Sequence, residues 1–250
     1  MRVGILLLTA TIALCTAPSA AAMPLQSMHA AAVTAAVRSD VGHVPAARAT
    51  RRRFTLVDES SGTVVRAVPH GRILGRLPGT TPLGTPTWLW ALRTSRDGRW
   101  AQVVLPWTPN GRTGWVTLRG RREAHTRIWV QADLSRRRVT LMRGRRALAA
   151  FVAAVGAPDS PTPIGRFSVT DPISTGDPGG PYGWYAFGLS GHQPHLPPGW
   201  SGGNQLAIHG TNTPSSLGTA ASAGCLRVSA SALAVLKRVL RPGTPVIIHP

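Results

Sequence analysis

The segment LAIHGTNTPSSLGTAASAGCLRV, residues 206–228, carries the residues that decide the fold and the chemistry of this 250-residue chain. Leu206-Ala207-Ile208 is a short apolar strand that leads into His209, and Cys225 follows a turn of small residues 16 positions later. A thiol is only slightly ionised at neutral pH, so an imidazole that takes its proton makes it a nucleophile. The segment predicts Cys225 as a nucleophile and His209 as its base.

The same turn predicts how a reaction intermediate is stabilised. Gly224 lets the backbone approach a substrate closely, and the amides of Gly224 and Cys225 are candidates for an oxyanion hole. No Asp or Glu follows Asp177, so the Gly210 carbonyl is expected to orient the imidazole of His209. Residues 126–250 hold four Asp and no Glu, which argues against a paired-carboxylate glycosidase and a His-Glu-x-x-His metalloprotease.

The residues around this segment predict a mostly β domain over 126–250. Alternating apolar residues indicate a hairpin from Ile128–Leu134 and Arg138–Met142. Residues 171–204 are rich in Gly, Pro and aromatic residues, which predicts either a disordered loop or a lid. Ser229–Leu240 has helical spacing and a Ser start, and Pro245–Ile248 is expected to be the closing strand.

The first 53 residues are expected to carry export signals and a tether. Arg2, an apolar run and small residues up to position 22 indicate a signal peptide over 1–22 and a secreted, extracytoplasmic protein. Leu14 stands where a lipoprotein signal needs a small residue, which argues against anchoring through Cys15. Residues 23–53 are rich in Ala and end in three Arg, so a tether is predicted.

Residues 54–121 are predicted to form a separate small β domain. Short apolar stretches alternate with Gly and Pro turns, and five of the eight tryptophans lie between Trp88 and Trp115. The stretch LPWTPNGRTGWV, residues 105–116, resembles a bacterial SH3-like barrel. Its tryptophans either bind the cell wall or fill the core of the barrel.

Charge narrows the expected partners. The chain has 28 Lys and Arg against 9 Asp and Glu, a formal net charge of +19. A strongly basic protein favours anionic surroundings, and export points to an anionic cell wall contacted through this basic surface and not to nucleic acid. Removal of a signal peptide would leave Cys225 as the only thiol.

Several segments together resemble the catalytic domain of L,D-transpeptidases, the YkuD family. The resemblance covers residues 126–250 and rests on IHGT followed by SAGCLRV, with PTPIGRF, PYGWYAFGLS and GTPVIIHP around them. It implies a β-rich catalytic domain with a short C-terminal helix, behind the SH3-like barrel. The pairing of Cys225 with His209, without carboxylates nearby in the sequence, predicts catalysis without a metal or cofactor.

The resemblance assigns roles by position. Cys225 becomes the nucleophile and His209 the general base, oriented by the Gly210 carbonyl, while the turn at Gly224 forms the oxyanion hole. Arg227 matches a basic residue that contacts a substrate carboxylate or braces the turn. Ser222 and Tyr182 are the other candidate substrate contacts. Many family members have His where this chain has Ala223, which removes one side-chain contact.

The activity that the resemblance implies is formation of 3→3 cross-links between peptidoglycan stem peptides through a Cys225 thioester, with carbapenems as covalent inhibitors. Hydrolysis of the thioester would instead make the chain an L,D-carboxypeptidase. A sortase has its His much farther upstream, and a papain-like peptidase has its Cys before its His. A non-catalytic wall-binding module held by zinc is the remaining alternative, with His192, His195, His209 and Cys225 as ligands.

Overall fold

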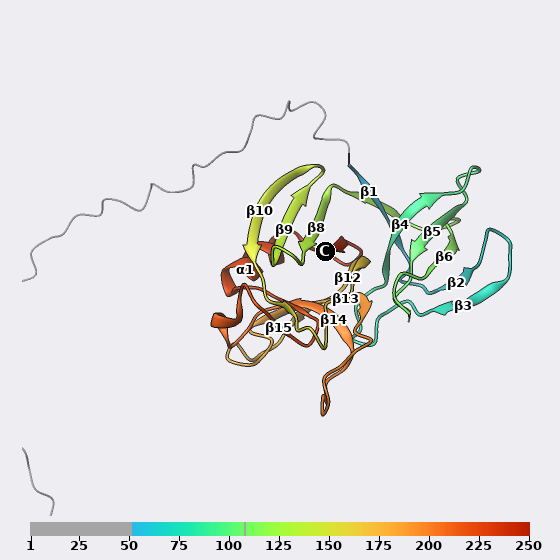
Figure 1. Ribbon diagram of the computed structural model, residues 1–250. Helices are drawn as coiled ribbons and strands as arrows, with labels where there is room; N and C mark the ends of the chain where they lie inside the picture. The colour runs from blue at the N-terminus through green and yellow to red at the C-terminus, as the bar shows by residue number, and fades with distance from the viewer. Residues whose placement is uncertain (1–51, 108) are drawn as a thin grey trace, which may run out of the picture. The chain divides into compact units, whose positions relative to one another are not determined.

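The computed structural model describes residues 52–107 and 109–250, which belong to one compact unit (Figure 1). The predicted signal peptide and nearly all of the predicted tether lie outside the described residues. The elements, in chain order, are β1 (Phe54–Asp58), β2 (Thr63–Arg66), β3 (Ile73–Leu77), β4 (Trp88–Thr94), β5 (Trp100–Val104), β6 (Thr113–Thr117), β7 (Glu123–Thr126), β8 (Ile128–Asp133), β9 (Arg138–Arg143), β10 (Arg146–Val152), β11 (Val155–Gly156), β12 (Gly165–Ser174), β13 (Tyr185–His192), β14 (Gln205–His209), the 3-10 turn η1 (Pro214–Ser216), β15 (Ala220–Ser222), β16 (Leu226–Arg227), α1 (Ala230–Val239) and β17 (Pro245–His249).

Strands β1–β7 form the first sheet, in the order β3-β2-β6-β5-β4-β1-β7, and all its strand pairs are antiparallel. Its core is apolar, with Val57, Val65, Val103 and Val116 fully or almost fully buried. A β-rich N-terminal part is therefore present, while an SH3-like barrel over residues 54–121 stays a prediction. Strand β7 joins this sheet beside β1 and extends it to Thr126.

The second sheet has the order β10-β9-β8-β17-β12-β13-β14-β16. Strands β8 and β9 form the predicted hairpin, which is confirmed. The predicted closing strand is β17, and it lies in the middle of the sheet, parallel to β8 and antiparallel to β12. The last strand of the chain therefore joins the opening hairpin to the strands that carry the site.

The loop predicted over residues 171–204 is partly wrong, because β12 runs to Ser174 and β13 occupies Tyr185–His192. Seven of the eight residues of β13 are buried, so this strand is a core element of the second sheet. Its glycines obscured the strand pattern in the sequence. Gly191 packs against an aromatic ring, and a Cβ atom there would lie 2.5 Å from the Phe167 ring.

The predicted C-terminal helix is confirmed as α1. The Ser229 hydroxyl caps its first turn by accepting a hydrogen bond from the Ala232 amide at 3.2 Å. Leu233 and Leu236 are fully buried in the core of the second sheet. Within the described part of the chain, no helix has the length and apolar character needed to cross a bilayer.

The two sheets share a third apolar cluster. It contains Phe54 and Trp90 of the first sheet and Trp129 of the second, with ring centroids 5.5 Å apart for Phe54–Trp90 and 6.1 Å apart for Phe54–Trp129. A hydrogen bond from the Thr81 hydroxyl to the buried Asp171 carboxylate also joins the sheets. The N-terminal sheet is thus packed against the domain that carries Cys225.

Candidate active site

The site is built on the parallel strands β14 and β16 at one edge of the second sheet. Ile208 pairs with Leu226 and His209 with Arg227, which places Cys225 next to Ala207. Successive side chains of a strand point to opposite faces, so His209, Cys225 and Arg227 share one face. Ile208 and Leu226 point the other way and are buried in the core. Core packing of two apolar residues therefore fixes which face carries the histidine and the thiol.

His209 is held in one orientation by its neighbour. The side chain is buried, with 3% exposure, and its Nδ1 atom lies 2.6 Å from the carbonyl oxygen of Gly210. A carbonyl can only accept, so Nδ1 carries the proton and Nε2 has the free lone pair that a base needs. Burial lowers the pKa of His209 to about 4, against the hydrogen bond to Gly210, which raises it. The imidazole is neutral at neutral pH.

Cys225 is half-buried and its sulfur lies 3.9 Å from the Gln205 carbonyl oxygen. Burial raises the pKa of the thiol, although the Ala207 amide and the charge of Arg227 favour the thiolate. The thiol and the imidazole are therefore both neutral before substrate binds. This arrangement suits proton transfer during attack more than a permanent thiolate–imidazolium pair.

Ser222 closes the turn that leads to Cys225. Its hydroxyl donates to the Cys225 carbonyl at 2.6 Å and accepts from the Gly224 amide at 3.1 Å. The side chain is buried with 2% exposure, so the structure places Ser222 within the turn and not in contact with solvent. The Gly224 amide thus already donates to the Ser222 hydroxyl. Of the two amides predicted to form the oxyanion hole, the Cys225 amide is therefore the remaining candidate donor.

Gln193 is a site residue that the sequence analysis missed. Its side-chain amide nitrogen lies 3.0 to 3.3 Å from three carbonyl oxygens, those of Ser160, Pro161 and Ala223. Its side-chain oxygen accepts from the His195 amide at 3.0 Å. Gln193 is 3% exposed and ties the Ser160–Pro161 turn to the turn before Cys225. A single Gln in a Gly- and Pro-rich segment gives no sequence signal for this role.

Gln193 also explains why position 224 is glycine. Gly224 has φ +111°, a conformation that side chains rarely adopt. A Cβ atom at this position would lie 2.0 Å from the amide nitrogen of Gln193. Gly224 therefore provides both the backbone conformation of the turn and the space for the residue that holds it.

Two of the predicted substrate contacts lie beside His209. Tyr182 is 41% exposed, and its ring stands edge-on to the imidazole, with ring centroids 4.9 Å apart. Arg227 is half-buried, and within the described residues its Nε atom is buried without a hydrogen-bond partner. An unpaired buried guanidinium donor next to a thiol and an imidazole is suited to an incoming anionic group.

The four residues of the zinc alternative do not form a metal site. Among residues 52–107 and 109–250, no group of three or more His, Cys, Asp or Glu is placed to hold a metal ion. His192 instead contacts Asn204 through Nδ1 at 3.3 Å and the Pro106 carbonyl through Nε2 at 3.2 Å. The Asn110 side chain, in the loop between β5 and β6, donates to the His192 carbonyl at 2.6 Å and accepts from the His192 amide at 2.8 Å. A loop of the first sheet therefore holds the end of β13, directly before Gln193.

The second domain is similar in sequence to known L,D-transpeptidases. Residues 127–248 match the family model of the YkuD L,D-transpeptidase catalytic domain. YkuD of Bacillus subtilis (strain 168), whose assignment as an L,D-transpeptidase is itself provisional, is 30% identical over 120 residues. The match covers 48% of this chain and 65% of that protein, so the chain spans just under two thirds of the length of this relative.

Solved structures give weaker likenesses. An L,D-transpeptidase from Mycobacterium smegmatis matches with a TM-score of 0.42 and 16% identity, over 65% of this chain and 82% of that one. L,D-transpeptidase 3 from Mycobacterium tuberculosis, in complex with a faropenem-derived adduct, matches with a TM-score of 0.39 and 18% identity, over 58% of this chain and 76% of that one.

Proposed function

We propose that this chain is an exported L,D-transpeptidase that forms 3→3 cross-links between peptidoglycan stem peptides, with Cys225 as nucleophile and His209 as general base. The observation that carries the proposal is the shared face of β14 and β16, where a half-buried thiol and a neutral imidazole lie on neighbouring strands. The match of residues 127–248 to the L,D-transpeptidase catalytic domain supports the same reaction class.

The first step is acylation of the thiol. The sulfur of Cys225 attacks the carbonyl carbon of the third stem residue while Nε2 of His209 accepts the thiol proton. The C–N bond to the terminal D-Ala then breaks, the proton passes to the leaving amine, and a thioester remains. The Cys225 amide binds the oxyanion, and the unpaired Nε–H of Arg227 is the donor for a stem carboxylate.

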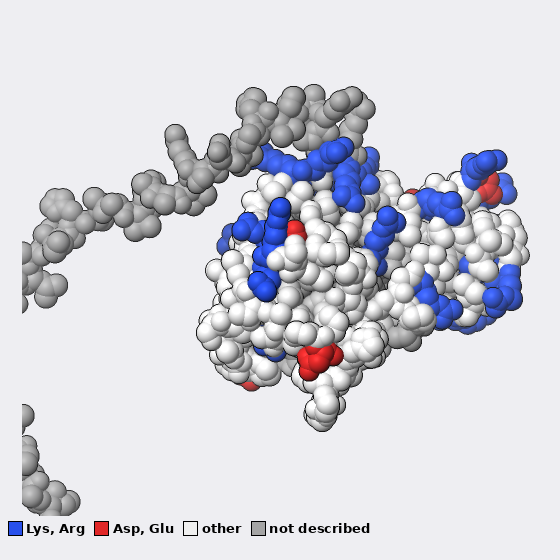
Figure 2. Space-filling model, in the orientation of Figure 1, with Lys and Arg blue, Asp and Glu red and all other residues white. Residues whose placement is uncertain are grey.

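The second step decides between transfer and hydrolysis. The side-chain amine of a second stem attacks the thioester carbonyl, His209 accepts a proton from that amine, and the thiol is released with a new amide bond. Attack by water would give an L,D-carboxypeptidase on the same stems. Figure 2 shows Lys and Arg side chains spread over the visible face with few acidic residues among them, which suits an anionic wall.

Acylation by a carbapenem, read by intact-protein mass spectrometry, tests the proposal. We expect one adduct per chain on Cys225, none in Cys225→Ala, and strongly slowed formation in His209→Ala. A folded protein with a free thiol and no adduct would contradict the assigned activity. An unchanged rate in His209→Ala would show that another group activates the thiol. Incubation with purified tetrapeptide muropeptides then separates cross-linked dimers from tripeptide products.

A further inference from the structure

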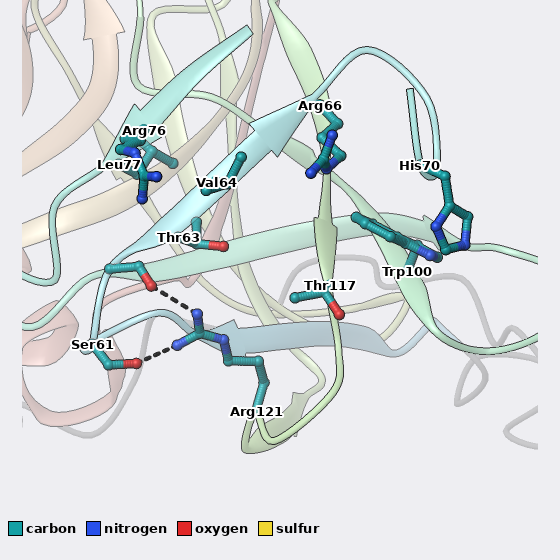
Figure 3. A pocket seen from close by; sticks show the side chains of 11 residues that line it. Ser61, Thr63, Val64, Arg66, His70, Arg76, Leu77, Trp100, Thr117 and Arg121 are labelled. Atoms are coloured by element: carbon teal, nitrogen blue, oxygen red, sulfur yellow. Dashed lines mark hydrogen bonds between the residues drawn. The ribbon is translucent and has the colours of Figure 1, made fainter. Parts of the chain in front are cut away.

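The first sheet contains a cavity of about 630 Å³ in which basic side chains gather (Figure 3). Arg66 of β2, Arg76 of β3, Arg121 after β6 and His70 of the β2–β3 turn all line it, together with Trp100 of β5. No Asp or Glu is among its lining residues. The cavity lies in the first sheet, so it is separate from the face of β14 and β16 that carries Cys225.

Arg121 is held by contacts within the protein. Its Nε atom lies 3.2 Å from the carboxylate of Glu59, which is fully buried, and one Nη atom donates to the Gly62 carbonyl at 2.7 Å. The other Nη atom donates to the Ser61 hydroxyl, as Figure 3 shows. Arg121 therefore forms part of the cavity wall, and its three side-chain nitrogen atoms are already engaged by Glu59, Gly62 and Ser61.

Arg66 and His70 are held in place around the opening. One Nη atom of Arg66 donates to the Gly71 carbonyl at 2.7 Å, which fixes the β2–β3 turn. His70 has φ +60°, a left-handed conformation that non-glycine residues seldom adopt. Its ring stands edge-on to Trp100, with ring centroids 5.0 Å apart. The remaining donors of Arg66 and the imidazole of His70 are thus presented at fixed positions.

Arg76 has no such internal role. It lies opposite Val64 on the exposed side of the β2–β3 pair, and its side chain makes no hydrogen bond or ion pair with any residue of 52–107 or 109–250. A guanidinium presents several N–H donors in a planar fork that matches carboxylate and phosphate oxygens. Arg66 and Arg76 together leave a positive charge without an acidic partner in the cavity.

We propose that this cavity binds an oxyanion, a carboxylate or a phosphate, carried by a cell-wall polymer, with Arg66 and Arg76 as its main ligands. The proposal rests on the proposed function only in placing the protein at the cell wall. Hydroxyl groups of Ser61 and Thr117 and the Trp100 ring line the same cavity and suit a hydroxylated polymer. The site would bind the protein to the polymer, while Cys225 reacts at the separate face formed by β14 and β16.

Binding of the full chain to purified sacculi tests this site, with Arg76→Gln compared against Arg96→Gln. Arg96 lies in the exposed β4–β5 turn outside the cavity, so both variants lose one charge from the same sheet. We expect Arg76→Gln to weaken binding to sacculi about tenfold, which is the lower end of what a hydrogen bond between charged groups contributes. Arg96→Gln should weaken this binding less than about twofold. Binding should also weaken with salt.

Sacculi treated to remove phosphodiester-linked polymers distinguish the two sources of the oxyanion. Loss of the Arg76-dependent binding after treatment assigns the site to phosphate, and its retention assigns the site to stem carboxylates. Equal binding by the two variants would overturn the proposal, because net charge alone would then explain wall association. Carbapenem acylation of the same variants should be unchanged, so failure of this site and failure of the Cys225 assignment give different results.

Discussion

Gly224→Ala should destabilise the protein through Gln193, beyond the backbone strain of the substitution itself. The new Cβ atom would lie 2.0 Å from the amide nitrogen of Gln193 and 2.9 Å from its amide carbon, so the Gln side chain must move. Movement breaks its contacts to the three carbonyl oxygens, and leaving buried polar groups unpaired costs about 1–3 kcal/mol. The positive φ adds about 1–2 kcal/mol for any residue with a Cβ atom.

Gly218→Ala is the matched control because it has the strain without the clash. Gly218 has φ +86°, and its nearest neighbour would lie 3.4 Å from a new Cβ atom, an ordinary contact. We expect a loss of about 1–2 kcal/mol in the free energy of unfolding for Gly218→Ala. For Gly224→Ala, strain and displaced hydrogen bonds together predict about 2–5 kcal/mol. Equilibrium urea unfolding, followed by tryptophan fluorescence, measures both values.

A double-mutant cycle with Gln193→Ala separates the two contributions. Shortening Gln193 removes the atoms that collide with the new Cβ atom, so Gly224→Ala should cost no more in that background than Gly218→Ala does in the wild type. Carbapenem acylation should slow at least tenfold in Gly224→Ala, because the turn that carries the Cys225 amide shifts. An equal cost of Gly224→Ala in both backgrounds would refute the role given to Gln193.

Three further predictions concern pH and the contact between the sheets. The rate of carbapenem acylation should stay level from pH 8 to about 5 and decline towards pH 4. Burial lowers the pKa of His209 to about 4, so the base is neutral above that pH. A decline centred near pH 6.5 in folded protein would contradict this prediction. Burial raises the pKa of Glu59 from its ordinary value of about 4.5 to about 7, so the folded state favours the protonated form. As pH rises from about 5 to 7.5, the free energy of unfolding of the wild type should therefore fall relative to that of Glu59→Gln, by at most about 3 kcal/mol. Urea unfolding of both proteins over this pH range measures the difference. A difference that does not change with pH would disprove the raised pKa. Asn110→Ala removes the two hydrogen bonds to the His192 backbone and should slow carbapenem acylation several-fold. The control Gln102→Ala, on the exposed face of the first sheet, should leave the rate unchanged. Equal rates in the two variants would show that the first sheet does not hold the active-site segment.

The sequence was sufficient for the local features of the second domain. Periodicity located the β8–β9 hairpin, and the Ser start and Pro stop located α1, since these patterns depend on neighbours within a few residues. The absence of acidic residues after Asp177 left the Gly210 carbonyl as the candidate partner for the base, and it lies 2.6 Å from Nδ1 of His209. Such a contact between adjacent residues is determined by local geometry.

Strand β13 marks where local patterns failed. In the sequence, its glycines are typical of a loop. In the structure, Phe167 and other side chains fill the space beside these glycines, so a larger residue would not fit. The sequence predicted an N-terminal domain and a second domain, and only the structure shows that Phe54 and Trp90 of the first pack against Trp129 of the second. Packing partners far apart in the chain are invisible to a periodicity argument.

By itself, the sequence determined the chemical groups of the site: one thiol in residues 52–250, a histidine 16 positions before it, and small residues in the turn between them. Only the tertiary structure decided that Gln193 holds this turn and that the Nε atom of Arg227 is left unpaired beside it. The reason is physical. Hydrogen bonds and burial depend on which surfaces meet after folding, and residues 160, 193 and 224 meet only when β13, β14 and β16 pair side by side.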